Sequence, residues 1–141
     1  MIETAVKVRN IFENNGQDID LPSFWRFPVG CCEGASLFLG KVLHDLFPKS
    51  IIEYVKGYSR DGEMHFWLLV DGLIFDLTAD QFPSIKAPIL GMSCSPLTTK
   101  FSDTEVIPIS EAFAKSDVTN AEYKNSLLIN LTYALTGEVR S

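Results

Sequence analysis

The sequence predicts an α+β protein in which helices flank an antiparallel sheet. Three observations lead to this prediction. Apolar residues recur at helical spacing near both ends of the chain, β-branched and aromatic residues gather between residues 51 and 78, and an Asp-Gly pair at 71 and 72 separates two of these segments as in a hairpin. The predicted order of elements is helix, helix, sheet, helix.

The first element is a helix over about residues 2–15. Ala5, Val8 and Phe12 lie at positions i, i+3 and i+7, which places them on one face, and Gly16 follows as a residue that can end the helix. The next segment, residues 17–30, contains two prolines and a closing glycine, so we expect it to be irregular.

A second helix is predicted from Cys32 to Leu46. Its apolar positions recur at helical spacing, and Pro48 stops the run; these positions are Ala35, Leu39, Val42, Leu43 and Leu46. Residues 51–58, 64–70 and 73–78 then have the composition of strands, and they predict an antiparallel sheet of at least three strands.

The last third of the chain begins with a long loop that contains Pro83, Pro88 and Pro96. A strand at about residues 104–110 and a short helix from Ser110 follow. A final helix is predicted after Thr119, which with Glu122 has the spacing of a capping box. Gly137 marks its exit, and its buried face is Leu127, Leu128, Leu131 and Leu135.

Composition limits the classes of function. The 141 residues, 46% of them apolar, suit one compact domain over residues 1–141. The net charge of −6 comes without a basic stripe, so nucleic acid and anionic membrane surfaces are not expected partners. No run approaches the ~20 apolar residues of a membrane span, and the N-terminus has no signal-like segment, so the expected location is cytoplasmic.

Two of the three cysteines are neighbours, Cys31 and Cys32, at the predicted start of the second helix. A disulfide between such neighbours needs strained geometry, and a chain of this size can form a core without disulfides, so reduced thiols are expected. The thiolate is the reactive form of cysteine, and a helix N-terminus and a nearby histidine both favour it. The pattern therefore directs attention to the histidines.

The chain has two histidines, His44 and His65. His44 lies about three turns along the same helix at ~1.5 Å per residue, too far from Cys32, so His65 is the candidate base. A base of this kind needs an acceptor for its second nitrogen. Asp76 lies on the strand that pairs with that of His65 and can be its neighbour if both side chains share a face, whereas Asp80 lies beyond the strand end.

Each of these residues also has a purely structural interpretation. An isolated cysteine is most often a buried core residue, His65 alone could be a satisfied histidine in a sheet, and Asp76 alone could cap a turn. The joint pattern favours one site, because a cysteine at a helix start, a histidine on a strand and an aspartate on the paired strand occur together in one small chain.

Four segments carry a family resemblance: "CCEGASLFLGKVL", "VKGY", "HFWLLV" and "DLTADQF". Together they resemble the transglutaminase-like branch of the papain-like cysteine enzymes, in particular small bacterial proteins of that branch. The matching features are Cys32 with Ala35, Gly57-Tyr58, His65-Phe66-Trp67 and Asp76-Leu77-Thr78. The resemblance spans about residues 27–82 and implies a papain-like core in which the nucleophile helix packs on an antiparallel sheet, with helices at both ends of the chain.

The resemblance implies a Cys-His-Asp triad of Cys32 as nucleophile, His65 as general base and acid, and Asp76 as orienting residue. It favours Cys32 over Cys31, which would be a packing residue. The backbone N–H of Cys32 is the first expected oxyanion donor. Papain-like enzymes place a second, polar donor upstream of the cysteine, so residues 23–25 are the segment in which it is expected. In those enzymes a glutamine lies six residues before the cysteine. This chain departs from that pattern, because it has Arg26 there.

Three further residues are expected at the substrate site: Trp25, Trp67 and Gln81. Trp67 shares a face with His65, and it either shields the imidazole or is a core tryptophan. Gln81 is either a polar pocket residue or a turn amide. Cys94 is interpreted as incidental, no metal-ligand spacing is present, and no cofactor is expected.

The predicted function is a cysteine hydrolase of the peptidase or amidase kind that acts through an acyl-thioester. Its substrate would be a peptide, a protein or a small amide. Two alternatives stay open: an acyltransferase, deamidase or transglutaminase that uses the same triad, and a binding module that has kept the fold without the chemistry. The motifs are specific for the fold and the triad rather than for the substrate.

Overall fold

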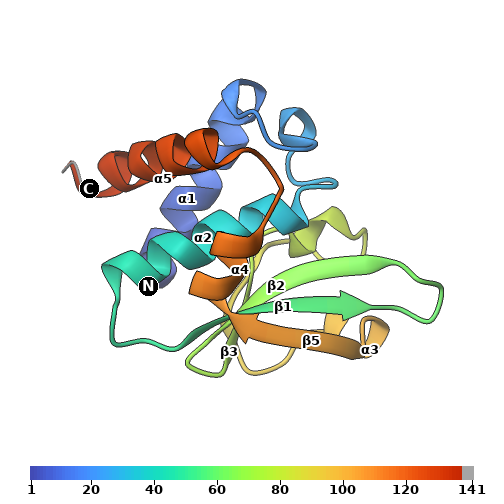
Figure 1. Cartoon of the computed structure of the whole chain (residues 1–141). Helices are drawn as coiled ribbons and strands as arrows, with labels where there is room; N and C mark the ends of the chain where they lie inside the picture. Colours follow the sequence, from blue (N-terminus) through green and yellow to red (C-terminus); the bar gives the residue numbers. More distant parts are fainter. Residues whose placement is uncertain (138–141) are drawn as a thin grey trace.

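The computed structural model describes residues 1–137, in which five α-helices accompany one five-stranded antiparallel sheet (Figure 1). The helices are α1 (Ile2–Asn15), α2 (Cys32–Leu46), α3 (Leu97–Lys100), α4 (Ile109–Lys115) and α5 (Ala121–Thr136). The strands are β1 (Ile52–Tyr58), β2 (Met64–Val70), β3 (Leu73–Asp76), β4 (Ile89–Met92) and β5 (Asp103–Pro108). The predicted α+β class is confirmed.

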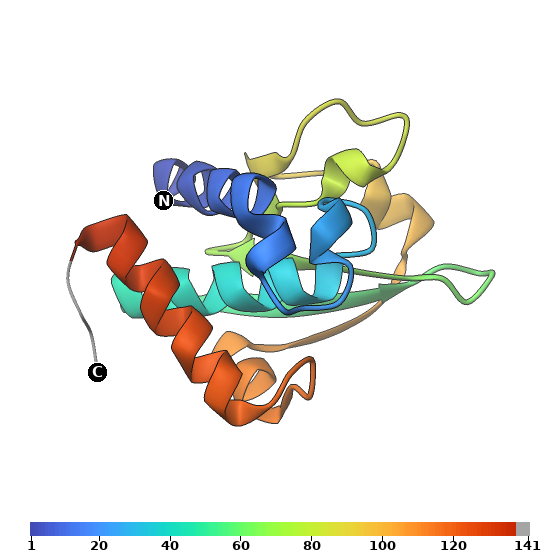
Figure 2. The ribbon, with the colours of Figure 1, turned by 90° about the horizontal axis from the view of Figure 1, so that it is seen from above.

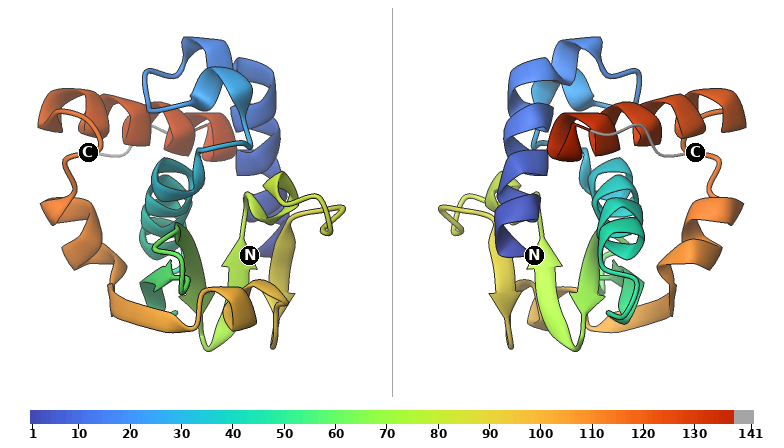
Figure 3. Two further views of the ribbon diagram at one scale, coloured as in Figure 1. Left: turned by 90° about the vertical axis from the view of Figure 1, so that its right-hand side faces the viewer. Right: turned by 90° about the vertical axis from the view of Figure 1, so that its left-hand side faces the viewer.

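The sheet has the strand order β4-β3-β2-β1-β5. β2 and β3 form the predicted hairpin, whose turn residues Asp71 and Gly72 have φ values of 50° and 82°, as a two-residue type I′ turn requires. The β2–β3 ladder ends where Leu68 lies opposite Phe75, whereas β1 pairs with β2 along its whole length. β2 and β3 therefore diverge from each other with distance from their shared turn (Figure 3).

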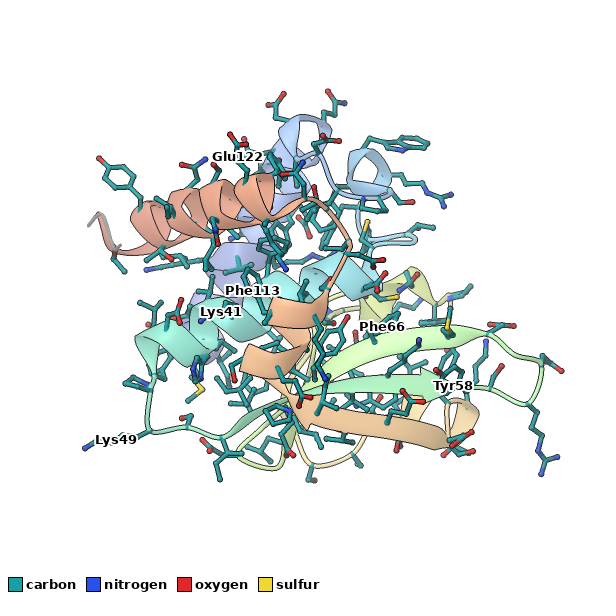
Figure 4. All side chains as sticks on the ribbon, in the orientation of Figure 1. Lys41, Lys49, Tyr58, Phe66, Phe113 and Glu122 are labelled. Atoms are coloured by element: carbon teal, nitrogen blue, oxygen red, sulfur yellow. The ribbon has the colours of Figure 1, made fainter. Side chains whose placement is uncertain are left out.

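Helices cover the two faces of the sheet unequally. α2 packs on β1 and β2, and α4 packs on α2. Figure 2 shows α5 crossing over α2, with α1 beside both. Phe113 of α4 lies next to Lys41 of α2 (Figure 4), with Lys41 Nζ 5.9 Å from the ring centroid. The opposite face of the sheet is covered by the short helix α3 and the chain that leads to it.

β2 is buried on both faces because its side chains alternate between them. Phe66 and Leu68 belong to the main core, which α2 shares, and the Ser36 hydroxyl of α2 donates to the Phe66 carbonyl at 3.1 Å. Trp67 points the other way, into a second cluster with Val55 and Phe101. By the same alternation His65 lies on the Trp67 face. The strand that carries the histidine therefore joins both cores.

The beginning of α5 corrects one prediction. Thr119 and Glu122 do not form a capping box, because the helix begins at Ala121 and the N-cap residue is Asn120. The Asn120 side-chain oxygen accepts from the backbone N–H of Tyr123 at 2.8 Å. Asparagine and threonine are both good N-cap residues, so the sequence alone did not decide between these adjacent positions. The predicted exit at Gly137 is confirmed, with φ 72°.

Two short elements lie inside the segment that was predicted to be a loop, the edge strand β4 and the helix α3. Each has four residues, and Pro88 and Gly91 interrupt the pattern that would signal β4. β3 is also shorter than predicted, since it ends at Asp76 rather than at residue 78. The chain turns there into a 3₁₀ helix over Ala79–Gln81.

Gly16 follows α1 as predicted, but for a different reason. Its φ of −57° is right-handed and suits any residue, so it is not a left-handed cap. A Cβ at this position would lie 2.2 Å from the backbone oxygen of Phe24, which no real structure allows. Glycine is needed there because the chain between α1 and α2 passes against its Cα.

We expect Gly16→Ala to lower the free energy of unfolding by about 2–3 kcal/mol, because backbone rather than a flexible side chain must move. Gly137→Ala is the matched control, since that glycine also follows a helix but a Cβ added to it would meet no atom of residues 1–137 within 4 Å. Its left-handed φ predicts a cost of about 1 kcal/mol. Urea denaturation of both variants measures the difference, and equal costs would contradict the close approach at Gly16.

Candidate active site

The neighbouring cysteines have opposite environments. The Cys31 side chain is buried, and its thiol donates to the backbone oxygens of Ser23 at 3.1 Å and Val29 at 3.4 Å. Burial raises the pKa of Cys31 to about 11. The charge of Cys32 acts in the same direction, and the charge of Arg26 opposes both. Cys31 is therefore held as a neutral thiol, whereas Cys32 is only partly buried.

Cys32 is the first residue of α2, at an N-terminus that no side chain caps. The first backbone hydrogen bond of the helix runs from the N–H of Ala35 to the oxygen of Cys31, which leaves the N–H groups of Cys32 and the next two residues directed out of the terminus. These donors and the helix dipole favour negative charge at this position. The same N–H groups can receive a developing oxyanion.

His65 and Asp76 form a buried hydrogen-bonded pair. The distance from His65 Nε2 to Asp76 Oδ2 is 2.7 Å, and the two residues are 0% and 1% exposed. Continuing the β2–β3 register places Asp76 opposite Trp67, one pair from His65 on the same face. The second oxygen, Oδ1, accepts from the backbone N–H of Thr78 at 3.3 Å. The geometry that the hairpin predicted for this pair is present.

Cys32 is the second polar side chain that interacts with the His65 ring. Asp76 occupies Nε2, and Nδ1 has no aligned hydrogen-bond partner within residues 1–137, so Nδ1 is the ring nitrogen to which we assign the Cys32 interaction. Burial lowers the pKa of His65, but the hydrogen bonds with Asp76 and Cys32 and the charges of both outweigh it and raise this pKa to about 9. The imidazole is therefore protonated at neutral pH.

Aromatic rings enclose the imidazole. The centroids of the Phe82, Phe101 and Trp67 rings lie 5.1, 5.4 and 5.7 Å from that of His65. Trp67 is 4% exposed and lies against β1 at Gly57, where a Cβ would come within 2.6 Å of its ring. Trp67 thus shields the histidine, and it is a core tryptophan at the same time. Its contact with substrate stays a prediction.

Trp25 lies in the opposite environment. It is 72% exposed in a 3₁₀ turn over Phe24–Arg26, while Phe24 beside it is buried. The Arg26 guanidinium carbon lies 5.7 Å from the Trp25 ring centroid. The turn adjoins the cysteine pair, because the preceding residue, Ser23, accepts from the Cys31 thiol. An exposed ring is available to a ligand, and binding of substrate by Trp25 stays a prediction.

The two rejected residues lie elsewhere. His44 is in the last turn of α2, at the far end of the helix from Cys32. Asp80 binds Arg9, with its Oδ1 2.6 Å from Arg9 Nη1 and its Oδ2 2.8 Å from Nη2.

Gln81 forms hydrogen bonds with both polar atoms of its side-chain amide. Its oxygen accepts from the backbone N–H of Gly30, and its nitrogen donates to the Thr78 hydroxyl.

Sequence reasoning missed Arg9, which also donates to the backbone oxygen of Leu77 at 2.7 Å. The residue is 9% exposed. A signal was present, because Arg9 lies at i+4 from Ala5 and at i+1 from Val8, within the apolar stripe of the first helix. A charged residue on a buried stripe indicates a buried partner.

Within residues 1–137, no group of three or more histidine, cysteine, aspartate or glutamate side chains could hold a metal ion. None of the helices in this part of the chain has the length and apolar content needed to cross a bilayer.

Comparisons of the chain with protein-family models, with curated proteins and with solved structures found no match. The resemblance to transglutaminase-like enzymes therefore stays a prediction from the motifs.

The His65 pair predicts a pH dependence of stability. Its pKa is about 6.5 in an unfolded chain and about 9 here, so the stabilisation is complete below about pH 6.5 and is lost as the pH rises toward 9. We expect the free energy of unfolding, measured with urea, to fall by about 2 kcal/mol between about pH 6 and about pH 8.5. His44→Gln should keep this slope, and the same slope in His65→Gln would contradict the assignment.

Proposed function

We propose that this protein is a cysteine hydrolase of the peptidase or amidase kind, built on a papain-like, transglutaminase-like core. The observation that carries the proposal is the arrangement of His65: one ring nitrogen bonds to the buried Asp76, while the ring also meets Cys32 at an uncapped helix N-terminus. Nucleophile, base and orienting residue in this order are the parts of an acyl-transfer triad.

The electrostatics support a thiolate–imidazolium pair. The raised pKa of His65 keeps the imidazole protonated at neutral pH, and Asp76 compensates that charge from the far side of the ring. The backbone N–H groups at the start of α2 favour a negative sulfur. Cys31, whose thiol is buried and neutral, leaves Cys32 as the nucleophile.

In the proposed acylation, the Cys32 sulfur forms a bond to the carbonyl carbon of an amide or ester, and the carbonyl π electrons move to oxygen. The N–H of Cys32 stabilises the resulting oxyanion. The His65 imidazolium then gives its proton to the leaving amine or alcohol as the carbon–nitrogen or carbon–oxygen bond breaks. A thioester on Cys32 and a neutral imidazole remain.

In the deacylation, the neutral His65 takes a proton from water while the water oxygen bonds to the thioester carbon. Collapse of this second intermediate releases the carboxylic acid and restores the thiolate and the imidazolium. An amine in place of water would give acyl transfer. Hydrolysis of a glutamine side chain by the same steps would be deamidation, so these alternatives share every step up to the thioester.

The fold supports the proposed core in outline. α2 packs on β1 and β2 so that its first residue meets the beginning of β2, and the aspartate ends the neighbouring strand. The departure at Arg26 leaves the second oxyanion donor unassigned, since this guanidinium lies over the Trp25 ring. Residues 23–25 still adjoin the nucleophile through the bond from Cys31 to Ser23.

We expect iodoacetamide at about pH 6.5 to alkylate Cys32 at least tenfold faster than Cys94, because a thiolate paired with an imidazolium reacts where an ordinary thiol does not. Cys94 is exposed and serves as the reference within the same molecule. Peptide mass spectrometry measures both rates. His65→Ala should abolish the difference and His44→Ala should preserve it, while equal rates in the wild type would refute the proposed ion pair.

We expect an acyl-enzyme with p-nitrophenyl acetate, detected as an acetyl group on Cys32 and as release of p-nitrophenolate. Cys32→Ala should abolish both signals, and Asp76→Asn should lower turnover by about 10²–10⁴-fold, because the imidazole loses its orienting carboxylate. Fast alkylation without any acylation would instead identify a binding module. Added primary amines that accelerate thioester breakdown would identify a transferase.

A further inference from the structure

The segment from Asp76 to Gln81 contacts three separate parts of the chain. Asp76 binds His65 on β2, and Asp80 binds Arg9 on α1. Gln81 binds Gly30, on the turn that precedes α2. The end of β3 and the 3₁₀ helix after it therefore connect the acid–base pair with the nucleophile turn.

The side-chain amide of Gln81 bridges this turn and the end of β3. Its Oε1 accepts from the backbone N–H of Gly30 at 3.2 Å, and its Nε2 donates to the Thr78 hydroxyl at 3.2 Å. Gly30 has a φ of 74°, and a Cβ there would lie within 3.2 Å of the Ser23 side chain, so this tight turn needs glycine. Cys32, the nucleophile, follows two residues later.

These bonds close a circuit around the site. From Gly30 it passes to Gln81 and then to Thr78, whose backbone N–H donates to Asp76 Oδ1 at 3.3 Å. Asp76 Oδ2 holds His65, and His65 meets Cys32, two residues from the starting point. The carboxylate that orients the base is thus linked to the nucleophile on both sides.

We propose that Gln81 is a positioning residue, which through the Gly30 N–H holds the nucleophile turn at the distance from His65 that the Cys32–His65 pair requires. This inference rests on the proposed function. It assigns Gln81 a task apart from substrate contact, and apart from that of an ordinary turn amide, because the bond to Gly30 spans 51 positions of sequence.

The Arg9–Asp80 pair makes Gln81 a firm anchor. The guanidinium binds both carboxylate oxygens of Asp80 and the backbone oxygen of Leu77, so the 3₁₀ helix is attached to α1. The Arg9 guanidinium carbon also lies 5.0 Å from the centroid of the Phe27 ring, in the segment before the nucleophile turn. Because Arg9 holds the 3₁₀ helix in place, the Gln81 side chain can fix the position of the turn at Gly30.

The test compares Gln81→Met, which removes both hydrogen bonds at similar size, with Gln81→Glu, which keeps an acceptor for Gly30. Gln17→Met is the matched control, since Gln17 is the other glutamine and is exposed. We expect Gln81→Met to slow iodoacetamide alkylation of Cys32 at neutral pH about tenfold and to move its pH profile upward, because a small misplacement weakens the ion pair. The alkylation rate of Gln81→Glu should stay within about threefold of the wild-type rate, and that of Gln17→Met should equal the wild-type rate.

The two possible failures are distinguishable. A wild-type Cys32 no faster than Cys94 overturns the proposed function, and with it the positioning task. A fast wild-type Cys32 with an unchanged profile in Gln81→Met overturns the inference about Gln81 alone. A slower Gln81→Met protein that Gln81→Glu does not rescue also overturns it, since the acceptor for Gly30 would then not matter.

A second measurement on the wild type does not depend on whether the variants fold. Amide hydrogen exchange, followed by NMR, should show the Gly30 N–H protected by at least about tenfold over its intrinsic rate, because its hydrogen bond must open before exchange. Exchange of Gly30 at the intrinsic rate overturns the inference. Where Gln81→Met folds, loss of this protection in the variant supports it.

Discussion

Asp76 and His65 are at most 1% exposed, and the 2.7 Å hydrogen bond between them lies where water has little access. Moving an isolated carboxylate or imidazolium into such a place costs several kcal/mol, so each is tolerated only because of the other. The Thr78 N–H satisfies the second oxygen of Asp76. The ends of β2 and β3 must therefore keep one relative position, and the rest of the site is built around it.

The sheet meets this requirement with the strand β2, which is buried on both faces. One face carries His65 and Trp67 into a small aromatic cluster, and the other carries Phe66 against α2. Because the β2–β3 ladder ends at Leu68, the histidine lies beyond the last paired residue of that ladder. Its ring can then reach a helix that packs on the opposite face of the same strand.

The adjacent cysteines show how one turn serves two purposes. Cys31 directs its thiol inward to backbone oxygens and packs in the core, whereas Cys32 begins the helix and meets His65. The turn before them is held by Cys31 from the inside and by Gln81 from the outside. A chain with three cysteines thus places two together because one holds the turn on which the other is presented.

The sequence by itself determined the local features: the bounds of the helix that starts at Cys32 and the Asp71-Gly72 hairpin, which makes His65 and Asp76 possible neighbours. These depend on spacing within one element or across one two-residue turn, where backbone geometry leaves little choice. Only the tertiary structure decided the contacts between distant segments, such as the approach of Gly16 to Phe24 and the bonds of Arg9, Asp80 and Gln81. No periodicity encodes them, because they depend on how separately folded elements pack.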